Sequence, residues 1–171
     1  MHAVKFSLFL PPGDFDEARA AAEWADAHGF DAARSVAIGM ADEGLFVTLF
    51  HARLDPGSGR VAYVDAGHGH CAILRADGEL ARLGAGSLPL GVRDDEVYRE
   101  ATAHLRPGDT LLAWSDGLVE RPERTVGLRD LAPDLDPSES AHALVARFMA
   151  GTPPRPEDDV TVLALRRTAD A

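Results

Sequence analysis

Three aspartates beside apolar segments are the clearest candidates for chemistry in this sequence. Asp116 follows the apolar run of residues 111–114, and Asp158 and Asp159 stand directly before the apolar run of residues 160–165. If these runs are neighbouring strands, their carboxylates meet at one edge of a sheet. Clustered carboxylates suit hard cations such as Mg²⁺ or Mn²⁺. The placement predicts an oxygen-ligated metal site, whereas the plainer alternative is ordinary strand capping in an acidic chain.

Residues 65–71 are rich in glycine and histidine and allow several interpretations. The spaced glycines match a loose dinucleotide fingerprint, but that motif needs a helix next, and here a strand and an Asp-Gly hairpin are expected. His68 and His70 form a cupin-like His-x-His pair, although no carboxylate follows at short spacing. Cys71 lacks the arginine of a cysteine-phosphatase loop and is better interpreted as a small buried apolar residue. A turn between strands explains both histidines.

Composition limits the partners and the compartment. The 171 residues contain 17 Lys and Arg against 28 Asp and Glu, a formal charge of -11 that disfavours nucleic acid. The apolar runs are far shorter than the roughly 20 residues that span a bilayer, so no membrane is expected. The first residues do not resemble a signal peptide, and Cys71 is the only cysteine. These features predict a cytoplasmic protein.

Hydrophobic periodicity predicts helices first and strands afterwards. Residues 14–28 and 31–41 have helical spacing, and from residue 44 onward the pattern changes to strands linked by hairpins. The expected strands are residues 45–54, 60–64, 71–75, 79–83, 96–105, 109–114 and 160–166, with a helix over residues 138–150. This order predicts an α+β domain with antiparallel sheet rather than βαβ units. One domain over residues 1–171 is expected, helical over 1–43 and β-rich over 44–166.

Six motifs, in order, resemble the metal-dependent serine/threonine phosphatases of the PPM superfamily, in the branch of the stage II sporulation protein E. They lie at residues 46–50, 65–68, 88–92, 107–109, 114–120 and 158–162. The resemblance implies two packed antiparallel β-sheets flanked by helices, an α-β-β-α sandwich, with a two-metal site for Mn²⁺ or Mg²⁺. It also implies that a metal-activated water hydrolyses phosphoserine or phosphothreonine.

The resemblance also assigns roles to individual residues. Asp116 matches the ligand aspartate of the family's Asp-Gly motif, and Asp158 matches the ligand aspartate before the last strand, with Asp159 as its neighbour. Gly117 has a supporting or structural role in this assignment. Gly67 and His68 have the same supporting or structural role.

One family motif is missing from the sequence. Members of the family carry Gly-Asp-x-x-Gly-His-Gly on a strand and turn just before the first helix, and its aspartate bridges both metals. Residues 1–5 look like the interior of that helix, as though the domain were truncated just after the motif. Asp14 and Asp16 follow Pro-Pro-Gly, a context that differs from the motif. A complete two-metal site is therefore not expected.

The leading prediction is a phosphatase that acts on a phosphorylated regulatory protein, of the anti-sigma-factor-antagonist type. The alternative is a pseudophosphatase or relic that binds a partner without turnover. A cupin-like small-molecule binder is disfavoured by the order of the elements.

Overall fold

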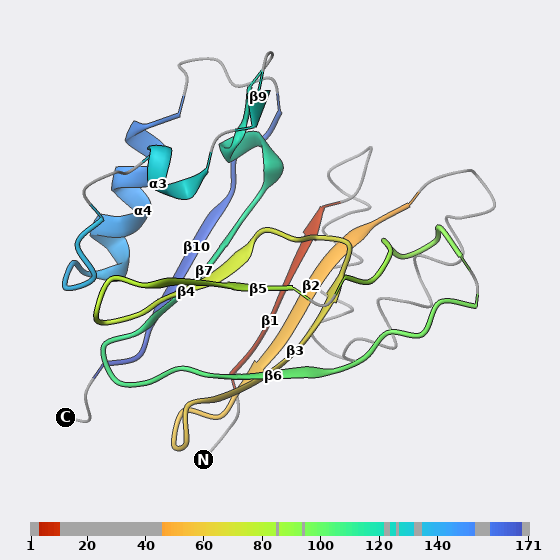
Figure 1. Cartoon of the computed structure of the whole chain (residues 1–171), viewed down its shortest axis with the longest axis horizontal. Helices are drawn as coiled ribbons and strands as arrows, with labels where there is room; N and C mark the ends of the chain where they lie inside the picture. Colours follow the sequence, from red (N-terminus) through yellow and green to blue (C-terminus); the bar gives the residue numbers. More distant parts are fainter. Residues whose placement is uncertain are drawn as a thin grey trace. The chain divides into compact units, whose positions relative to one another are not determined.

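The computed structural model of the chain describes residues 4–10, 46–84, 86–93, 95–121, 124–125, 127–131, 135–152 and 158–168. The helices expected at residues 14–28 and 31–41 lie outside these ranges. The chain divides into two compact units, one of residues 1–69 and 84–104 and the other of residues 70–83 and 105–171. Each unit is built around one four-stranded antiparallel sheet, as Figure 1 shows. The two antiparallel sheets implied by the family resemblance are therefore present.

The sheet of the first unit has the order β1-β2-β3-β6. Its strands are β1 (Val4–Leu10), β2 (Thr48–Leu54), β3 (Arg60–Ala66) and β6 (Ala101–His104). The β2–β3 hairpin turns at Asp55, whose carboxylate accepts hydrogen bonds from the Gly57 backbone N–H and the Ser58 hydroxyl. The hairpin expected between the strands at residues 45–54 and 60–64 is confirmed.

The sheet of the second unit has the order β10-β7-β4-β5. Its strands are β4 (Cys71–Leu74), β5 (Leu80–Leu83), β7 (Thr110–Trp114) and β10 (Val162–Arg166). Strand β7 is buried along its whole length and pairs with both β4 and β10. The expected adjacency of the strand before Asp116 and the strand after Asp159 is therefore confirmed.

Helix α4 (Ala141–Ala150) packs along β10 and covers one face of this sheet (Figure 1). The helix begins at Ser140, whose hydroxyl accepts a hydrogen bond of 3.1 Å from the Ala143 backbone N–H. Leu144 and Phe148 are buried against Leu112 and Trp114 of β7 in the core of the unit. Shorter elements complete the order: the 3₁₀ helix η1 (Asp116–Leu118), β8 (Glu120–Arg121), β9 (Arg124–Thr125) and α3 (Leu128–Leu131).

The prediction for the first residues is wrong. Residues 1–5 were expected inside a helix, but Val4–Leu10 forms the strand β1, which pairs antiparallel with β2 from Val4↔Leu54 to Leu10↔Thr48. The sequence VKFSLFL is rich in aromatic and branched residues that favour strands, and β2 provides hydrogen-bond partners along one side of this edge strand. Asp14 and Asp16, whose context was expected to differ from the family motif, lie outside the described ranges.

The predicted hairpin between residues 96–105 and 109–114 is also wrong. Strand β6 pairs with β3, whereas β7 pairs with β4 and β10, so the two strands belong to different sheets. The tight turn itself is present, since the Asp109 backbone N–H donates to the Arg106 carbonyl oxygen at 2.9 Å and Gly108 has a φ of 88°. The turn residues fix the local bend but not the partner of the strand that follows.

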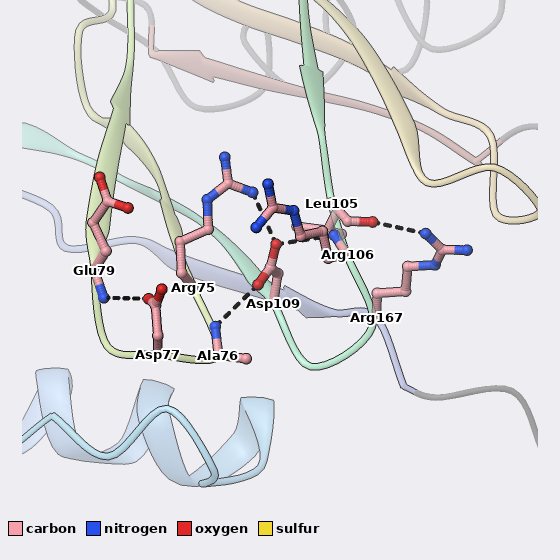
Figure 2. A network of polar contacts seen from close by, with 8 residues as sticks. All are labelled: Arg75, Ala76, Asp77, Glu79, Leu105, Arg106, Asp109 and Arg167. Carbon is pink, nitrogen blue, oxygen red and sulfur yellow. Dashed lines mark hydrogen bonds and ion pairs between the residues drawn. The ribbon is translucent and has the colours of Figure 1, made fainter.

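The carboxylate of Asp109 ties this turn to the β4–β5 hairpin (Figure 2). Its oxygens accept hydrogen bonds from the Arg106 N–H at 2.9 Å, the Ala76 N–H at 3.0 Å and the Arg75 guanidinium at 2.8 Å. Burial alone raises the pKa of Asp109, but these three donors and the charge of Arg75 outweigh it and lower the pKa below its usual value. The buried carboxylate is therefore held as an anion that joins two loops of one unit.

Asp109→Asn is expected to lower the free energy of unfolding at pH 7 by about 2 kcal/mol, because it weakens charge-assisted hydrogen bonds. A carboxylate with a lowered folded-state pKa stabilises the fold above its unfolded pKa and loses that contribution as the pH falls through the folded value. Urea titrations from pH 7 down to pH 3 should show the gap between wild type and variant closing below about pH 4.

The control is Asp77→Asn, which alters an exposed turn carboxylate of the neighbouring hairpin (Figure 2). In the Asp77→Asn variant the free energy of unfolding should still fall at acidic pH by nearly as much as in the wild type. A gap for Asp109→Asn that stays constant across the pH range would show that its charge contributes nothing to stability.

None of the helices in the described part of the chain has the length and apolar character needed to span a bilayer.

Candidate metal centre

The predicted metal residues come from two backbone segments that touch. Asp116 opens η1, separated from the end of β7 by Ser115, and is half-buried, whereas Asp158 and Asp159 precede β10 and are exposed. A Cβ atom placed on Gly117 would lie 2.6 Å from the carbonyl oxygen of Asp159 and 2.9 Å from that of Asp158. The segments are so close that only glycine fits here. The backbone next to Asp116 thus contacts the Asp158–Asp159 backbone, and the meeting of the carboxylates themselves stays a prediction.

Both ligand candidates have one carboxylate oxygen fixed by the following backbone amide. The Gly117 N–H donates to Asp116 Oδ1 at 2.8 Å, and the Asp159 N–H donates to Asp158 Oδ1 at 2.7 Å. Such short local bonds restrict the rotation of each carboxylate. The second oxygen, Oδ2, receives neither of these bonds.

The candidate ligands are of the chemical type that suits an oxygen-ligated divalent cation, but there are too few of them for a complete coordination sphere. Carboxylate oxygens are the ligands that Mg²⁺ and Mn²⁺ prefer. Within the described ranges, however, no three Asp, Glu, His or Cys side chains form a group that could hold a metal ion. The carboxylates of Asp116 and Asp158 can therefore supply part of a coordination sphere.

The structure places Gly67 and His68 in a turn of the other unit, after β3. The buried Asp65 carboxylate accepts hydrogen bonds from the backbone N–H groups of His68 at 2.8 Å and Gly69 at 3.1 Å. Gly67 has a φ of 73°, and a Cβ there would lie 2.6 Å from the Pro89 ring. Gly67 is therefore required by backbone geometry and close packing, and a supporting role for either residue at a metal stays a prediction.

Cys71 and His70 have the structural roles expected from the sequence, Cys71 as a small buried residue and His70 as part of a turn between strands. Cys71 is fully buried in β4, and the β4–β5 hairpin follows, so the dinucleotide fingerprint does not apply. The His70 ring lies 5.9 Å from the Trp114 ring between centroids, and the Trp114 backbone N–H donates to the His70 carbonyl oxygen at 3.0 Å. His70 thus packs beside the strand that leads to Asp116.

The sequence model of the family described as stage II sporulation protein E (SpoIIE) matches residues 21–168. The chain belongs to the SpoIIE family. This match covers Asp116 and the Asp158–Asp159 segment.

Individual relatives agree with the SpoIIE family assignment. Phosphoserine phosphatase RsbU of Bacillus subtilis is 31% identical over 80 residues, which are 46% of this chain and 24% of RsbU. The structure of the RsbU and RsbW domains of Rv1364c from Mycobacterium tuberculosis has a TM-score of 0.73 and 25% identity, covering 99% of this chain and 53% of that one.

A more distant structure shares the fold. The catalytic domain of the serine/threonine protein phosphatase PstP, from Mycobacterium tuberculosis, is 21% identical with a TM-score of 0.58. The alignment covers 94% of this chain and 86% of that one, and PstP is described in complex with two manganese ions. The chain spans about a quarter of RsbU and about half of the Rv1364c chain.

Proposed function

We propose that this chain is a SpoIIE-type phosphatase domain that hydrolyses phosphoserine or phosphothreonine on a regulatory protein with the help of Mn²⁺ or Mg²⁺. The observation that carries the proposal is the contact of Gly117 with the Asp158–Asp159 backbone, which joins the two family aspartates. The name of RsbU, a phosphoserine phosphatase, supports the substrate class. The lone Cys71 and the acidic composition are consistent with action in the cytoplasm.

In this proposal Asp116 and Asp158 hold a divalent cation, with Asp159 beside them. When bound, such a cation supplies a water of lowered pKa and neutralises charge on the phosphate. The chain carries a formal charge of -11, so a phosphate dianion would be repelled without a cation at the site. Oδ1 of each aspartate accepts a backbone N–H, so the two carboxylates would offer the cation ligands that are restrained by their own backbone.

The partner is a phosphoprotein in this proposal, of the anti-sigma-factor-antagonist type that the family resemblance implies. The Rv1364c structure, which contains RsbU and RsbW domains in one protein, supports a place in that kind of regulation. A second candidate function is partner binding without turnover. It is favoured by the lack, within the described residues, of a three-ligand metal group.

The test is the response of thermal stability to Mn²⁺, since a ligand that binds the folded state raises its melting temperature. We expect Mn²⁺ to raise the melting temperature of the wild type. The combination of Asp116→Asn and Asp158→Asn should remove the response, because neutral amides do not replace carboxylate ligands. Release of phosphate from a phosphoserine peptide, measured in parallel, should be slow in the wild type and absent in the double variant.

A matched control removes two negative charges elsewhere. Asp77→Asn with Asp95→Asn changes two exposed carboxylates and should keep the full Mn²⁺ response. An equal Mn²⁺ response in the wild type and in the Asp116, Asp158 double variant would remove these residues from the site.

A further inference from the structure

The buried residue Ser115 bonds to the segment that carries Asp158 and Asp159. Its hydroxyl donates a hydrogen bond of 2.8 Å to the Asp159 carbonyl oxygen and accepts one of 2.8 Å from the Thr161 backbone N–H. Its own backbone N–H donates to the Thr161 carbonyl oxygen at 3.0 Å. Ser115 is thus bonded to both ends of the stretch from Asp159 to Thr161.

Ser115 also stands at a position where a serine hydroxyl usually caps the helix that follows it. Ser115 is the N-cap residue of η1, with an extended backbone at φ -80° and ψ 159°. A serine at that position commonly accepts a hydrogen bond from an N–H two or three residues later. Here the side chain makes no such bond to η1. The hydroxyl is turned away from its own helix to the segment before β10.

These hydrogen bonds join the segments next to β7 and β10 beyond the last paired residues of the two strands. The β7–β10 register ends at Trp114↔Val162, and Asp158 lies four residues before Val162. Past the ladder, the Ser115 hydroxyl holds the carbonyl of Asp159, the residue next to Asp158. Asp116 is the next residue after Ser115, so the side chain of Ser115 links the residue before one ligand candidate to the residue after the other.

We propose that Ser115 is a positioning residue of the metal centre, which sets the separation of the Asp116 and Asp158 carboxylates. This inference rests on the proposed function, because it assumes that the two aspartates bind one cation. Ser115 itself offers no ligand to the cation in this arrangement, since its hydroxyl is bonded to Asp159 and Thr161. Replacing residues that orient metal ligands typically lowers metal affinity by about 10- to 100-fold.

The experiment compares Ser115→Ala and Ser115→Thr with wild type, with Mn²⁺ alone as the probe. The Mn²⁺ dissociation constant is measured from the electron paramagnetic resonance signal of free Mn²⁺, and hydrogen exchange of the Thr161 amide reports the bond to Ser115. Ser115→Ala should raise the dissociation constant about tenfold and accelerate Thr161 exchange. Ser115→Thr keeps the hydroxyl and should restore both values toward wild type.

The matched control is Ser140→Ala, which removes a comparable hydrogen bond that the Ala143 backbone N–H donates to the Ser140 hydroxyl at the start of α4. It should lower the melting temperature and leave the Mn²⁺ dissociation constant unchanged. Ser115→Cys keeps the side-chain size but forms weak hydrogen bonds, and it gives the same comparison if Ser115→Ala does not fold.

The outcomes separate this inference from the proposed function. Equal Mn²⁺ affinity of wild type and Ser115→Ala, with faster Thr161 exchange, would make Ser115 a structural residue only and leave the metal site standing. Failure of the wild type to bind Mn²⁺ would overturn the metal site and this inference together. A tenfold loss in Ser115→Ala alone, restored by Ser115→Thr, supports the positioning role even if no phosphatase activity is found.

Discussion

Replacing Trp114 by alanine is expected to lower the free energy of unfolding by about 3–5 kcal/mol, the usual cost of removing a buried indole from a packed core. Trp114 is 2% exposed at the end of β7 and belongs to the core formed with Leu118, Leu144 and Phe148. Its backbone pairs with Val162 of β10, and Ser115 and Asp116 follow Trp114 in the sequence. Loss of the ring would loosen the strand end that directs Asp116. Denaturant titration monitored by circular dichroism measures the change.

Two further variants separate burial from other effects. Among the described residues, the Trp114 Nε1 atom has no hydrogen-bond acceptor, so Trp114→Phe gives up no such bond and should cost far less than Trp114→Ala. Phe46→Ala truncates an aromatic ring that is 50% exposed and should also cost less. A value near zero for Trp114→Ala would place the ring outside the core and contradict the packing described here.

The core of this fold could be predicted from local sequence patterns. The sequence pattern predicts β2, β3, β4 and β5, which are short apolar runs bounded by turns of glycine, proline and aspartate. This is possible because the pairing in a hairpin depends on residues that are close in the sequence. The pairing of the strand before Asp116 with the last strand was also predicted correctly. The helix before the last strand was expected from residue 138, whereas Ser140 is the residue whose hydroxyl caps it.

The wrong predictions concern contacts that sequence neighbours do not determine. The turn at residues 106–109 looks like a hairpin, but the Asp109 carboxylate bonds to Arg75 and Ala76, which belong to another hairpin far along the chain. The strand β1 depends on pairing with β2 across more than 30 residues. Pairing between residues so far apart produces no periodic pattern near β1, where the sequence shows only a short apolar run.

The candidate site was predicted in part. Asp116, Gly117 and Asp158 could be found because they are placed at strand ends and match a family motif. Ser115 was missed, since a serine before an Asp-Gly turn looks like an ordinary helix cap. The direction of its hydroxyl, toward Asp159 rather than toward η1, is visible only in three dimensions.

Completing the missing family motif is expected to raise Mn²⁺-dependent phosphatase activity by orders of magnitude. We expect this gain when a strand and turn with the sequence Gly-Asp-x-x-Gly-His-Gly are added ahead of Met1. Two dications a few ångströms apart repel one another strongly, and an anion between them is needed to hold both. The family resemblance gives that role to the aspartate of this motif.

The measurement that tests the account most directly is the initial rate of p-nitrophenyl phosphate hydrolysis with Mn²⁺. It compares the 171-residue chain, the extended chain, and the extended chain that also carries Asp116→Asn or Asp158→Asn. The expected result is weak or undetectable turnover by the 171-residue chain, a large gain in the extended chain, and loss of that gain with either asparagine. A gain that persists with Asp116→Asn would contradict the assignment of Asp116 to the metal centre, and robust Mn²⁺-dependent turnover by the unextended chain would contradict the missing motif.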